Sequence, residues 1–193
     1  MTEKPPLAYP AACWALARCA ACTARLLAGH RLHLPDKHVR LRLRFADGTS
    51  ARVYRETVAD HGPVREPCVL VVEFRLRGVS GWGHAVFRWE SLLNTPLFAG
   101  FPGFVSKLWL AADGRGRYRG LYQWDGAGAA DRYARALWRV LALVSVPGSI
   151  HYIVLPGRCR DEVLARAELA AGRVPAAAGQ VDPAAWWRLT GAA

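Results

Sequence analysis

The 193-residue chain has almost no lysine, although it is strongly basic. Of its 26 basic residues only Lys4, Lys37 and Lys107 are lysines, and the arginines are spread along the whole length. A nucleic-acid interface gathers its cations on one face or along one helix. The net charge of +11 therefore does not predict a nucleic acid as partner, but it is compatible with an acidic small molecule or an acidic protein.

The sequence also lacks a regular set of cysteines and a long apolar run. Its five cysteines include one CxxC pair, Cys19 and Cys22, with no second pair to complete a metal site, so we interpret them as small packing residues. Segment 11–28 is the most apolar, but Arg18 and Arg25 interrupt the run of about 20 residues that a membrane span needs. We therefore expect no membrane span and a cytoplasmic location.

Signatures of common catalytic centres are missing as well. The sequence contains no HExxH motif, no paired carboxylate motif and no Gly-rich phosphate loop after a strand. His30, His33 and His38 are loosely spaced in one predicted loop. We expect neither a bound metal nor another cofactor.

What is present is typical of a globular protein with a large core, since 52% of the residues are hydrophobic and 21% are charged. Turn-forming residues at 59–67 predict a domain boundary. We divide the chain into an N-terminal extension at 1–67, a main domain at 68–157, and a C-terminal helix with a mobile tail at 158–193.

The extension is predicted to hold one helix and one β-hairpin. The helix covers 11–28, and residues 39–45 alternate between apolar and arginine positions. Asp47 and Gly48 favour a tight turn, after which 51–58 resumes an extended pattern. We expect the apolar face of the hairpin to be buried and its arginine row to be solvated.

The main domain reads as a βαββαβ unit, the order of a ferredoxin-like α+β fold. Its apolar periodicity predicts strands at 69–77, 104–110, 118–124 and 150–155, and helices at about 83–94 and 126–145.

Alternation along the strands assigns side chains to faces. The apolar residues of strand 69–77 should lie under the helices, which places Glu73 and Arg75 on the opposite face. Lys107 and Trp109 share one face of their own strand. If both pairs lie on the same side of the sheet, Glu73 can pair with Lys107, either to stabilise a dimer or to orient an acidic substrate.

A second face is aromatic. Tyr118, Tyr122 and Trp124 alternate along one strand, and Gly120 leaves space between them. Such a face can stack a planar ligand or fill a dimer interface, and the sequence leaves both alternatives open.

Two histidines are candidates for proton transfer. His84 begins the first predicted helix, where the positive helix end favours a neutral imidazole that can act as a general base. His151 faces away from Tyr152 on the last strand, so one of the two points toward the helices. The structural alternatives are a polar helix start for His84 and a hydrogen-bonded core position for His151.

Four segments carry a family resemblance: FPGFVSKLWL at 101–110, RYRGLYQWD at 117–125, GAADRYARALW at 128–138 and SIHYIVLPG at 149–157. They resemble the dimeric α/β-barrel superfamily, in particular the small monooxygenase-like proteins related to the antibiotic-biosynthesis-monooxygenase group. The resemblance covers roughly residues 68–157.

This resemblance implies a homodimer in which two sheets pack into a barrel and each subunit holds an aromatic, polyketide-like substrate between its sheet and its helices. It also implies oxygenation without metal, flavin or haem, because an electron-rich phenol anion reacts with oxygen directly. The pocket residues of the group have counterparts by type in Asn94, Trp109, Tyr122 and Arg75.

We therefore expect a cofactor-independent monooxygenase or a related tailoring enzyme that acts on a planar aromatic compound. The candidate catalytic residues are His84 or His151 for proton transfer, with Arg75 and Asn94, together with Lys107, stabilising an oxyanion. The candidate substrate-binding residues are Glu73, Lys107, Trp109, Tyr122 and Trp124. A non-catalytic ligand-binding or dimerisation module is the alternative, and a haem-binding relative with His84 or His151 as axial ligand is a third.

Overall fold

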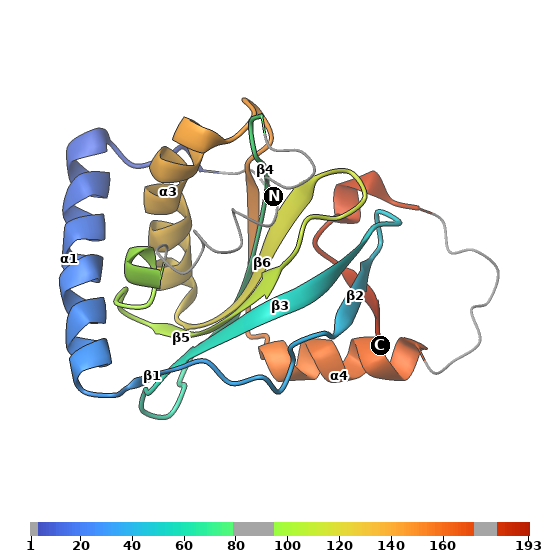
Figure 1. Ribbon diagram of the computed structural model, residues 1–193, viewed down its shortest axis with the longest axis horizontal. Coiled ribbons are helices and arrows are strands. Elements are labelled where there is room, and N and C mark those ends of the chain that lie inside the picture. The colour runs from blue at the N-terminus through green and yellow to red at the C-terminus, as the bar shows by residue number, and fades with distance from the viewer. Residues whose placement is uncertain (1–3, 79–94, 172–180) are drawn as a thin grey trace.

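A computed structural model describes residues 4–78, 95–171 and 181–193 (Figure 1). The chain forms one curled antiparallel sheet with helices on both faces. The sheet order is β7-β4-β6-β5-β3-β2-β8, and β1 pairs with β3. The strands are β1 (Leu32–His33), β2 (Arg42–Phe45), β3 (Ser50–Ala59), β4 (Pro67–Arg75), β5 (Phe104–Leu110), β6 (Arg117–Asp125), β7 (His151–Pro156) and β8 (Leu189–Ala192).

The four strands of the main domain have the antiparallel order β7-β4-β6-β5, with α3 (Ala127–Val144) connecting β6 to β7. This agrees with the predicted ferredoxin-like α+β fold. β5 coincides with the predicted strand at 104–110, and α3 lies within the predicted helix at 126–145. The helix predicted at 83–94 lies outside the described residues.

One hydrophobic core lies between α3 and the sheet. Leu70 and Val72 of β4 contribute to it, as the alternation predicted, together with Tyr133 and Leu137 of α3. Outside α3 lie α1 (Tyr9–Ala28), which confirms the predicted N-terminal helix, and the short helix η1 (Thr95–Leu97).

Close contact between α1 and the loop that follows η1 depends on a glycine. A side-chain carbon at Gly100 would overlap the carbonyl oxygen of Cys19 and come within 2.6 Å of the Thr23 backbone nitrogen. Only a residue without a side chain lets the two backbones approach this closely. Gly100 therefore fixes where α1 lies against the domain.

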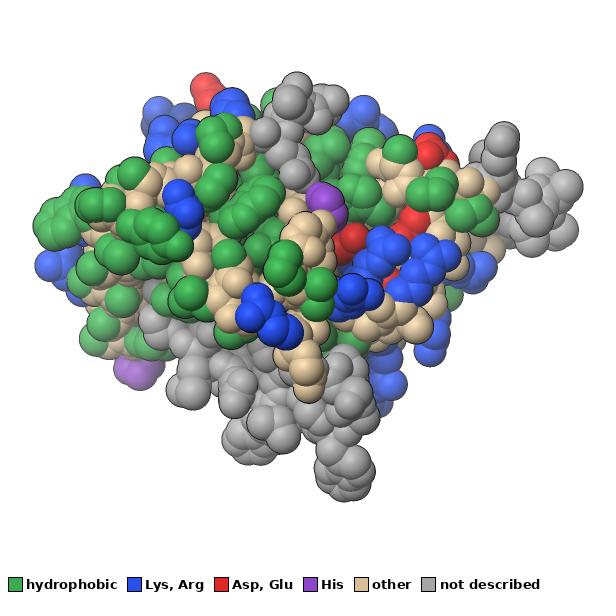
Figure 2. All heavy atoms as spheres, turned by 90° about the horizontal axis from the view of Figure 1, so that it is seen from above, with side chains coloured by type: hydrophobic (Ala, Val, Ile, Leu, Met, Phe, Trp, Pro, Cys, Tyr) green, Lys and Arg blue, Asp and Glu red, His purple; other side chains and the backbone are tan. Residues whose placement is uncertain are grey.

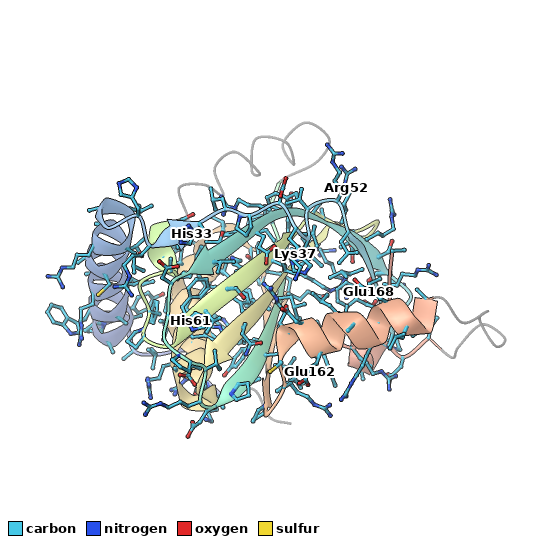
Figure 3. All side chains as sticks on the ribbon, turned by 90° about the horizontal axis from the view of Figure 1, so that it is seen from below. His33, Lys37, Arg52, His61, Glu162 and Glu168 are labelled. Carbon is cyan, nitrogen blue, oxygen red and sulfur yellow. The ribbon has the colours of Figure 1, made fainter. Side chains whose placement is uncertain are left out.

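A second core lies on the opposite face of the sheet, under α4 (Arg160–Ala171) and β8 (Figure 3). Leu43, Val69 and Leu108 pack there with Leu164 of α4, and Ala192 of β8 completes the layer. The sheet face through which a dimeric barrel would form is thus covered by the chain itself.

The expectation of a mobile tail was wrong for the last residues. β8 pairs with β2 in the sheet, and Trp186 and Trp187 pack against the second core. Local propensity in this Ala-rich, Pro-rich segment is weak, so tertiary pairing rather than local sequence forms the strand.

The N-terminal hairpin belongs to the same sheet. β2 and β3 pair as predicted, with Leu43 and Phe45 buried and the intervening arginines exposed. β3 also pairs along its length with β5. The boundary predicted at 59–67 therefore falls between two strands of one sheet.

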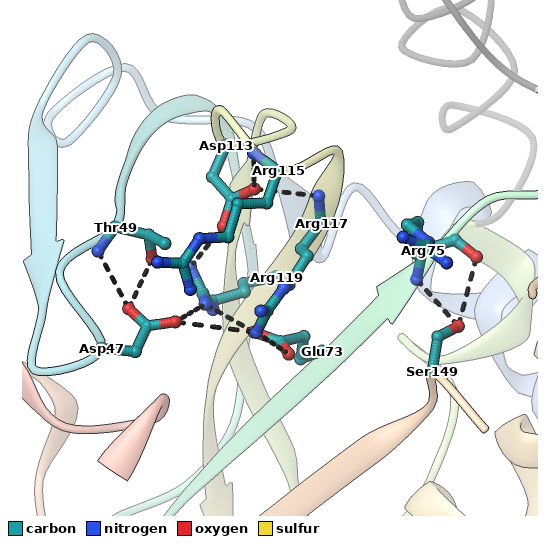
Figure 4. Close-up of polar contacts among 9 residues, drawn as sticks. All are labelled: Asp47, Thr49, Glu73, Arg75, Asp113, Arg115, Arg117, Arg119 and Ser149. Carbon is teal, nitrogen blue, oxygen red and sulfur yellow. Dashed lines mark hydrogen bonds and ion pairs between the residues drawn. The ribbon is translucent and has the colours of Figure 1, made fainter. Parts of the chain in front are cut away.

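A buried ionic network ties the hairpin to the main domain (Figure 4). Arg119 of β6 is fully buried and binds Asp47 at 2.8 Å, Glu73 at 2.5 Å and Asp113 at 3.2 Å. Thr49 donates two hydrogen bonds to Asp47. Burial alone would raise the pKa of Asp47, but these hydrogen bonds and the charges of Arg119 and Arg117 outweigh it and lower the pKa.

The outer surface of α1 exposes large apolar side chains beside two arginines, Arg18 and Arg25. Tyr9, Trp14 and Leu27 are more than half exposed, and Figure 2 shows hydrophobic side chains gathered at this end of the molecule. By length and composition α1 is the one described helix that could cross a membrane. This is weak evidence, because core helices and N-terminal signal sequences share those properties.

Candidate functional site

A cavity of about 180 Å³ lies between α3 and the sheet, and its walls are mostly apolar and aromatic. Residues from β3, β4, β5, β6 and α3 line it together with the segment at 97–98. The lining residues are Tyr54, Phe74, Leu97, Phe98, Lys107, Trp109, Leu110, Tyr118, Arg119, Gly120, Tyr122, Tyr133, Leu137, Val140, Leu141 and Val144.

Among the described lining residues, Lys107 is the one whose charge is not matched by carboxylates. Arg119 also lines the cavity, but its guanidinium binds the three carboxylates of the network described above. Lys107 is only 6% exposed, and no ion pair or hydrogen bond to its ammonium is found among the described residues. Burial, with the nearby positive charge of Arg55, lowers the pKa of Lys107 well below its ordinary value.

Aromatic rings surround the amine instead of carboxylates. The Lys107 Nζ atom lies 3.1 Å from the ring centre of Trp109, 4.6 Å from that of Phe98 and 4.7 Å from that of Tyr122. Ring faces attract a cation, but they replace only part of the hydration that burial removes. Lys107 is therefore placed to exist as a neutral amine or to meet an anionic group.

Trp109 is held in place by β3. Its indole N–H donates to Thr57 Oγ1 at 3.1 Å, and the Arg55 guanidinium carbon lies 3.9 Å from its ring centre. Residues paired across neighbouring strands point to the same face, and Arg55 pairs with Trp109 as Thr57 pairs with Lys107. A second cation thus lies beside the amine without lining the cavity.

Two tyrosines form a hydrogen-bonded pair in the cavity wall. The Tyr133 hydroxyl donates to that of Tyr122 at 3.2 Å. Burial raises the pKa of both phenols, so both stay protonated. Gly120 permits this arrangement, because a side-chain carbon there would lie 2.6 Å from the Tyr122 ring. The described part of the wall therefore offers phenolic O–H groups and no carboxylate.

The described walls of the cavity contain no His, Cys, Asp or Glu side chain. Among the described residues, no three His, Cys, Asp or Glu side chains lie close enough together to hold a metal ion. The functional groups that the described walls supply are an amine, phenol hydroxyls and aromatic rings.

Three of the candidate residues named from sequence meet in this cavity: Lys107, Trp109 and Tyr122. Trp124 lies next to it in the core, fully buried against Phe104 and Tyr133, and does not line the cavity.

Other candidates lie elsewhere. Glu73 and His151 pair across β4 and β7 and point to the opposite sheet face, where the His151 ring centre lies 6.2 Å from that of Trp186. Tyr152 is the residue that points toward the helices, and its hydroxyl donates to Asp131 of α3 at 3.1 Å. Proton transfer by His151 in this cavity is excluded by the sheet between them.

The predicted pair between Glu73 and Lys107 was wrong. Glu73 pairs across the sheet with Arg119, and Lys107 pairs with Tyr122. Arg119 and Tyr122 are an odd number of residues apart on one strand, so their side chains lie on opposite faces. The alternation within each strand was predictable, but the alignment of one strand with another was not.

Arg75 is exposed at the end of β4 and does not line the cavity; its backbone N–H donates to the Ser149 hydroxyl (Figure 4). His84 and Asn94 lie outside the described residues.

Sequence reasoning missed Arg55 and the α3 side of the cavity. Tyr133 and Leu137 were visible as part of an apolar helical stripe, which predicts core and not a cavity wall. Arg55 lies on a predicted strand, but nothing in the sequence indicated that this strand pairs with β5.

Together the fold and the cavity define a ferredoxin-like α+β protein with a largely apolar cavity between helix and sheet. No family model matches the chain, and no curated protein matches it. A solved ferredoxin-fold protein from Listeria monocytogenes, described as related to antibiotic biosynthesis monooxygenases, is 16% identical with a TM-score of 0.41; the match covers 56% of this chain and 64% of that chain.

A solved anthrone oxidase-like protein is 18% identical with a TM-score of 0.36, and that match covers 56% of this chain and 54% of that chain. The description of the Listeria protein names the group that the sequence motifs resemble. The chain spans less than two thirds of either protein, and likeness at this level concerns the fold alone.

Proposed function

We propose that the protein is a small-molecule enzyme that binds a planar aromatic phenol in the cavity under α3 and oxygenates it without a cofactor. The observation that carries the proposal is Lys107, a buried amine surrounded by aromatic rings in a cavity whose described walls hold no carboxylate.

The walls suit a flat ligand. Trp109 and Tyr122 line the cavity, and aromatic pairs gain about 0.5–1.5 kcal/mol beyond the area they bury. The volume of about 180 Å³ is close to the roughly 150 Å³ of an engineered cavity that accepts benzene. One ring with substituents is therefore the expected size of the bound part.

Lys107 is the proposed proton acceptor. A neutral amine takes the phenolic proton, and the resulting ammonium stays beside the phenolate it has produced. The guanidinium of Arg55, across the Trp109 ring, adds positive potential to the same place. Because the pair forms inside an apolar cavity, the attraction is stronger than it would be in water.

The ionised ring is electron-rich enough to reduce oxygen directly. For a substrate with a methylene group activated by the ring, the balance is CH2 + O2 → C=O + H2O. One oxygen atom enters the product, the other leaves as water with both methylene hydrogens, and the substrate supplies all four electrons. No further reductant is required.

The test compares oxygen uptake with phenols of one, two and three fused rings, and measures their binding by quenching of tryptophan fluorescence. Lys107→Met should lower turnover roughly 10²–10⁴-fold, the usual contribution of a general base. Lys107→Arg retains a positive charge but accepts no proton, so it should bind the anion without turnover. Unchanged turnover in both variants would contradict the proposal.

Binding without turnover in the unaltered protein would favour the non-catalytic ligand-binding module instead. The homodimer and the cytoplasmic location remain predictions. The coverage of one sheet face by α4 and β8 limits where a second copy could dock.

A further inference from the structure

Lys107 differs in its surroundings from the other two lysines of the chain. Lys4 is 64% exposed and lies 3.3 Å from an Asp131 carboxylate oxygen, and Lys37 is exposed to solvent. Lys107 is buried, faces rings and opens onto a cavity. Two of the lysines are thus ordinary surface amines, and the third is a buried amine at a largely apolar cavity.

Amines become nucleophiles toward carbonyl groups in two settings, a desolvated apolar pocket and the neighbourhood of another cation. Lys107 meets both conditions. The cavity walls remove water from its amine, and Arg55 stacks on the same Trp109 ring, 3.9 Å from the ring centre, on the neighbouring strand. Both effects favour the neutral amine, in which the nitrogen lone pair is free to react.

We infer that Lys107 forms an imine with aromatic aldehydes and ketones bound in the cavity. The inference rests on the cavity of the proposed function but requires no oxygen. It adds carbonyl chemistry to the proton transfer proposed for the same amine.

The reaction balances within the site. The lone pair of the Lys107 nitrogen attacks the carbonyl carbon, a C–N bond forms, and the carbonyl oxygen takes up a proton. The C–O bond then breaks, and the oxygen leaves as water that carries both hydrogens of the amine. A C=N bond remains, and no oxidant or reductant takes part.

Tyr122 is placed to assist the loss of water. Its ring centre lies 4.7 Å from the amine, and its hydroxyl accepts a hydrogen bond from Tyr133. A phenol that already accepts one hydrogen bond donates a stronger hydrogen bond in turn. Tyr122 is therefore proposed to donate a hydrogen bond to the departing oxygen in the same step.

The ligand class follows from the walls. Trp109 and Tyr122 both line the cavity and both lie beside the amine, so a flat aryl group that packs against their side chains can bring its carbonyl to Lys107. The cavity volume selects a one-ring compound over a larger one. 2-Hydroxybenzaldehyde is a suitable probe, because it carries the phenol of the proposed substrate and a reactive carbonyl.

The experiment traps the imine with cyanoborohydride under anaerobic conditions at pH 6.5 and locates the adduct by peptide mass mapping. With only Lys4, Lys37 and Lys107 as lysines, each possible site is resolved. The expected result is at least tenfold more adduct at Lys107 than at either surface lysine, and loss of this adduct in Lys107→Arg. Lys37→Arg is the matched control and should retain it.

Tyr122→Phe should slow formation of the Lys107 adduct without moving the adduct to another lysine. If Tyr122 had only a structural role, the substitution would leave the rate of adduct formation unchanged at equal ligand affinity. Adducts distributed over Lys4, Lys37 and the terminal amine, with Lys107 unmodified until the protein is unfolded in urea, would overturn the inference.

The two proposals can fail separately. Oxygen uptake that depends on Lys107 without a trapped imine would remove this inference and leave the proposed function. A trapped imine without oxygen uptake would do the reverse.

Discussion

Two buried cations lie on opposite faces of one sheet and have opposite surroundings. Arg119 is matched by the carboxylates of Asp47, Glu73 and Asp113, whereas Lys107 is matched by aromatic rings. A buried charge is expensive unless it is paired and hydrogen-bonded. Arg119 therefore serves the fold, and Lys107 carries a cost that a ligand can relieve.

That cost is measurable. Lys107→Met should raise the free energy of unfolding at pH 7 by about 1–4 kcal/mol, the range seen when apolar residues replace buried ionic ones. Urea unfolding measures it, and Lys37→Met is the matched surface control, expected to change stability by less than about 0.5 kcal/mol.

The stabilisation should also depend on pH. Because burial lowers the folded pKa of Lys107, the unfolded chain binds more protons between the folded pKa and the ordinary value of about 10. The contribution of Lys107 to the free energy of unfolding of the wild type therefore rises with pH between these two pKa values. The stability gained by Lys107→Met should accordingly become smaller toward pH 10. An advantage that stays constant with pH would exclude the proposed desolvation.

At the scale of elements, the Arg119 network joins the β2–β3 turn to β4 and to the β5–β6 turn. Arg119→Met leaves three carboxylates without their buried partner, so we expect a loss of about 3–5 kcal/mol in the free energy of unfolding. Arg117 contacts the same acids but is 31% exposed, and Arg117→Met should cost about 1 kcal/mol or less. Equal losses in the two variants would show that burial is not the deciding factor.

Acid should remove part of the same stabilisation. The folded pKa of Asp47 is lowered, so its contribution is present above the unfolded pKa of about 4 and is lost as pH falls through the folded value. Asp47→Asn should therefore be less stable than the wild type at neutral pH and approach it in acid. Denaturation curves at pH 7 and pH 3 give the comparison.

Elements with a clear period were predictable from sequence. The predicted strand at 104–110 and the stripe at 126–145 correspond to β5 and α3. Burial of one face imposes the helical period of α3, whereas β5 is buried along its whole length. β1, β8 and the pairing of β3 with β5 were not predicted, since they depend on contacts between distant segments.

The candidate site was predictable to the same extent. The shared face of Lys107 and Trp109 follows from their spacing, and both line the cavity. The alignment of neighbouring strands places Glu73 and His151 on the opposite face of the sheet and Arg55 beside Trp109. A shift of one residue in that alignment would move these side chains to the other face.

At the scale of the whole molecule, one sheet separates two cores that different segments cover. α3 closes one, and α4 with β8 closes the other. A chain that ends after Gly157 would expose the apolar residues of the second core: Leu43, Val69, Val71, Leu108 and Leu121. Exposed patches of this kind favour association.

We therefore expect the truncated chain to have a larger mass than the full chain in size-exclusion chromatography with light scattering. A chain ending after Ala171 keeps α4 but lacks β8, Trp186 and Trp187, and should fall between the two. The same mass and the same unfolding midpoint in all three chains would show that α4 and β8 are not needed to cover the sheet.

β8 also sets an order of events during synthesis on the ribosome. Every strand around the amine-lined cavity has been made once β6 has emerged, and α3 follows directly. The other sheet face stays open until residues 189–192 reach β2. A nascent chain thus carries a finished binding cavity on one side and an uncovered apolar face on the other, and during that interval it is most exposed to aggregation and to capture by chaperones.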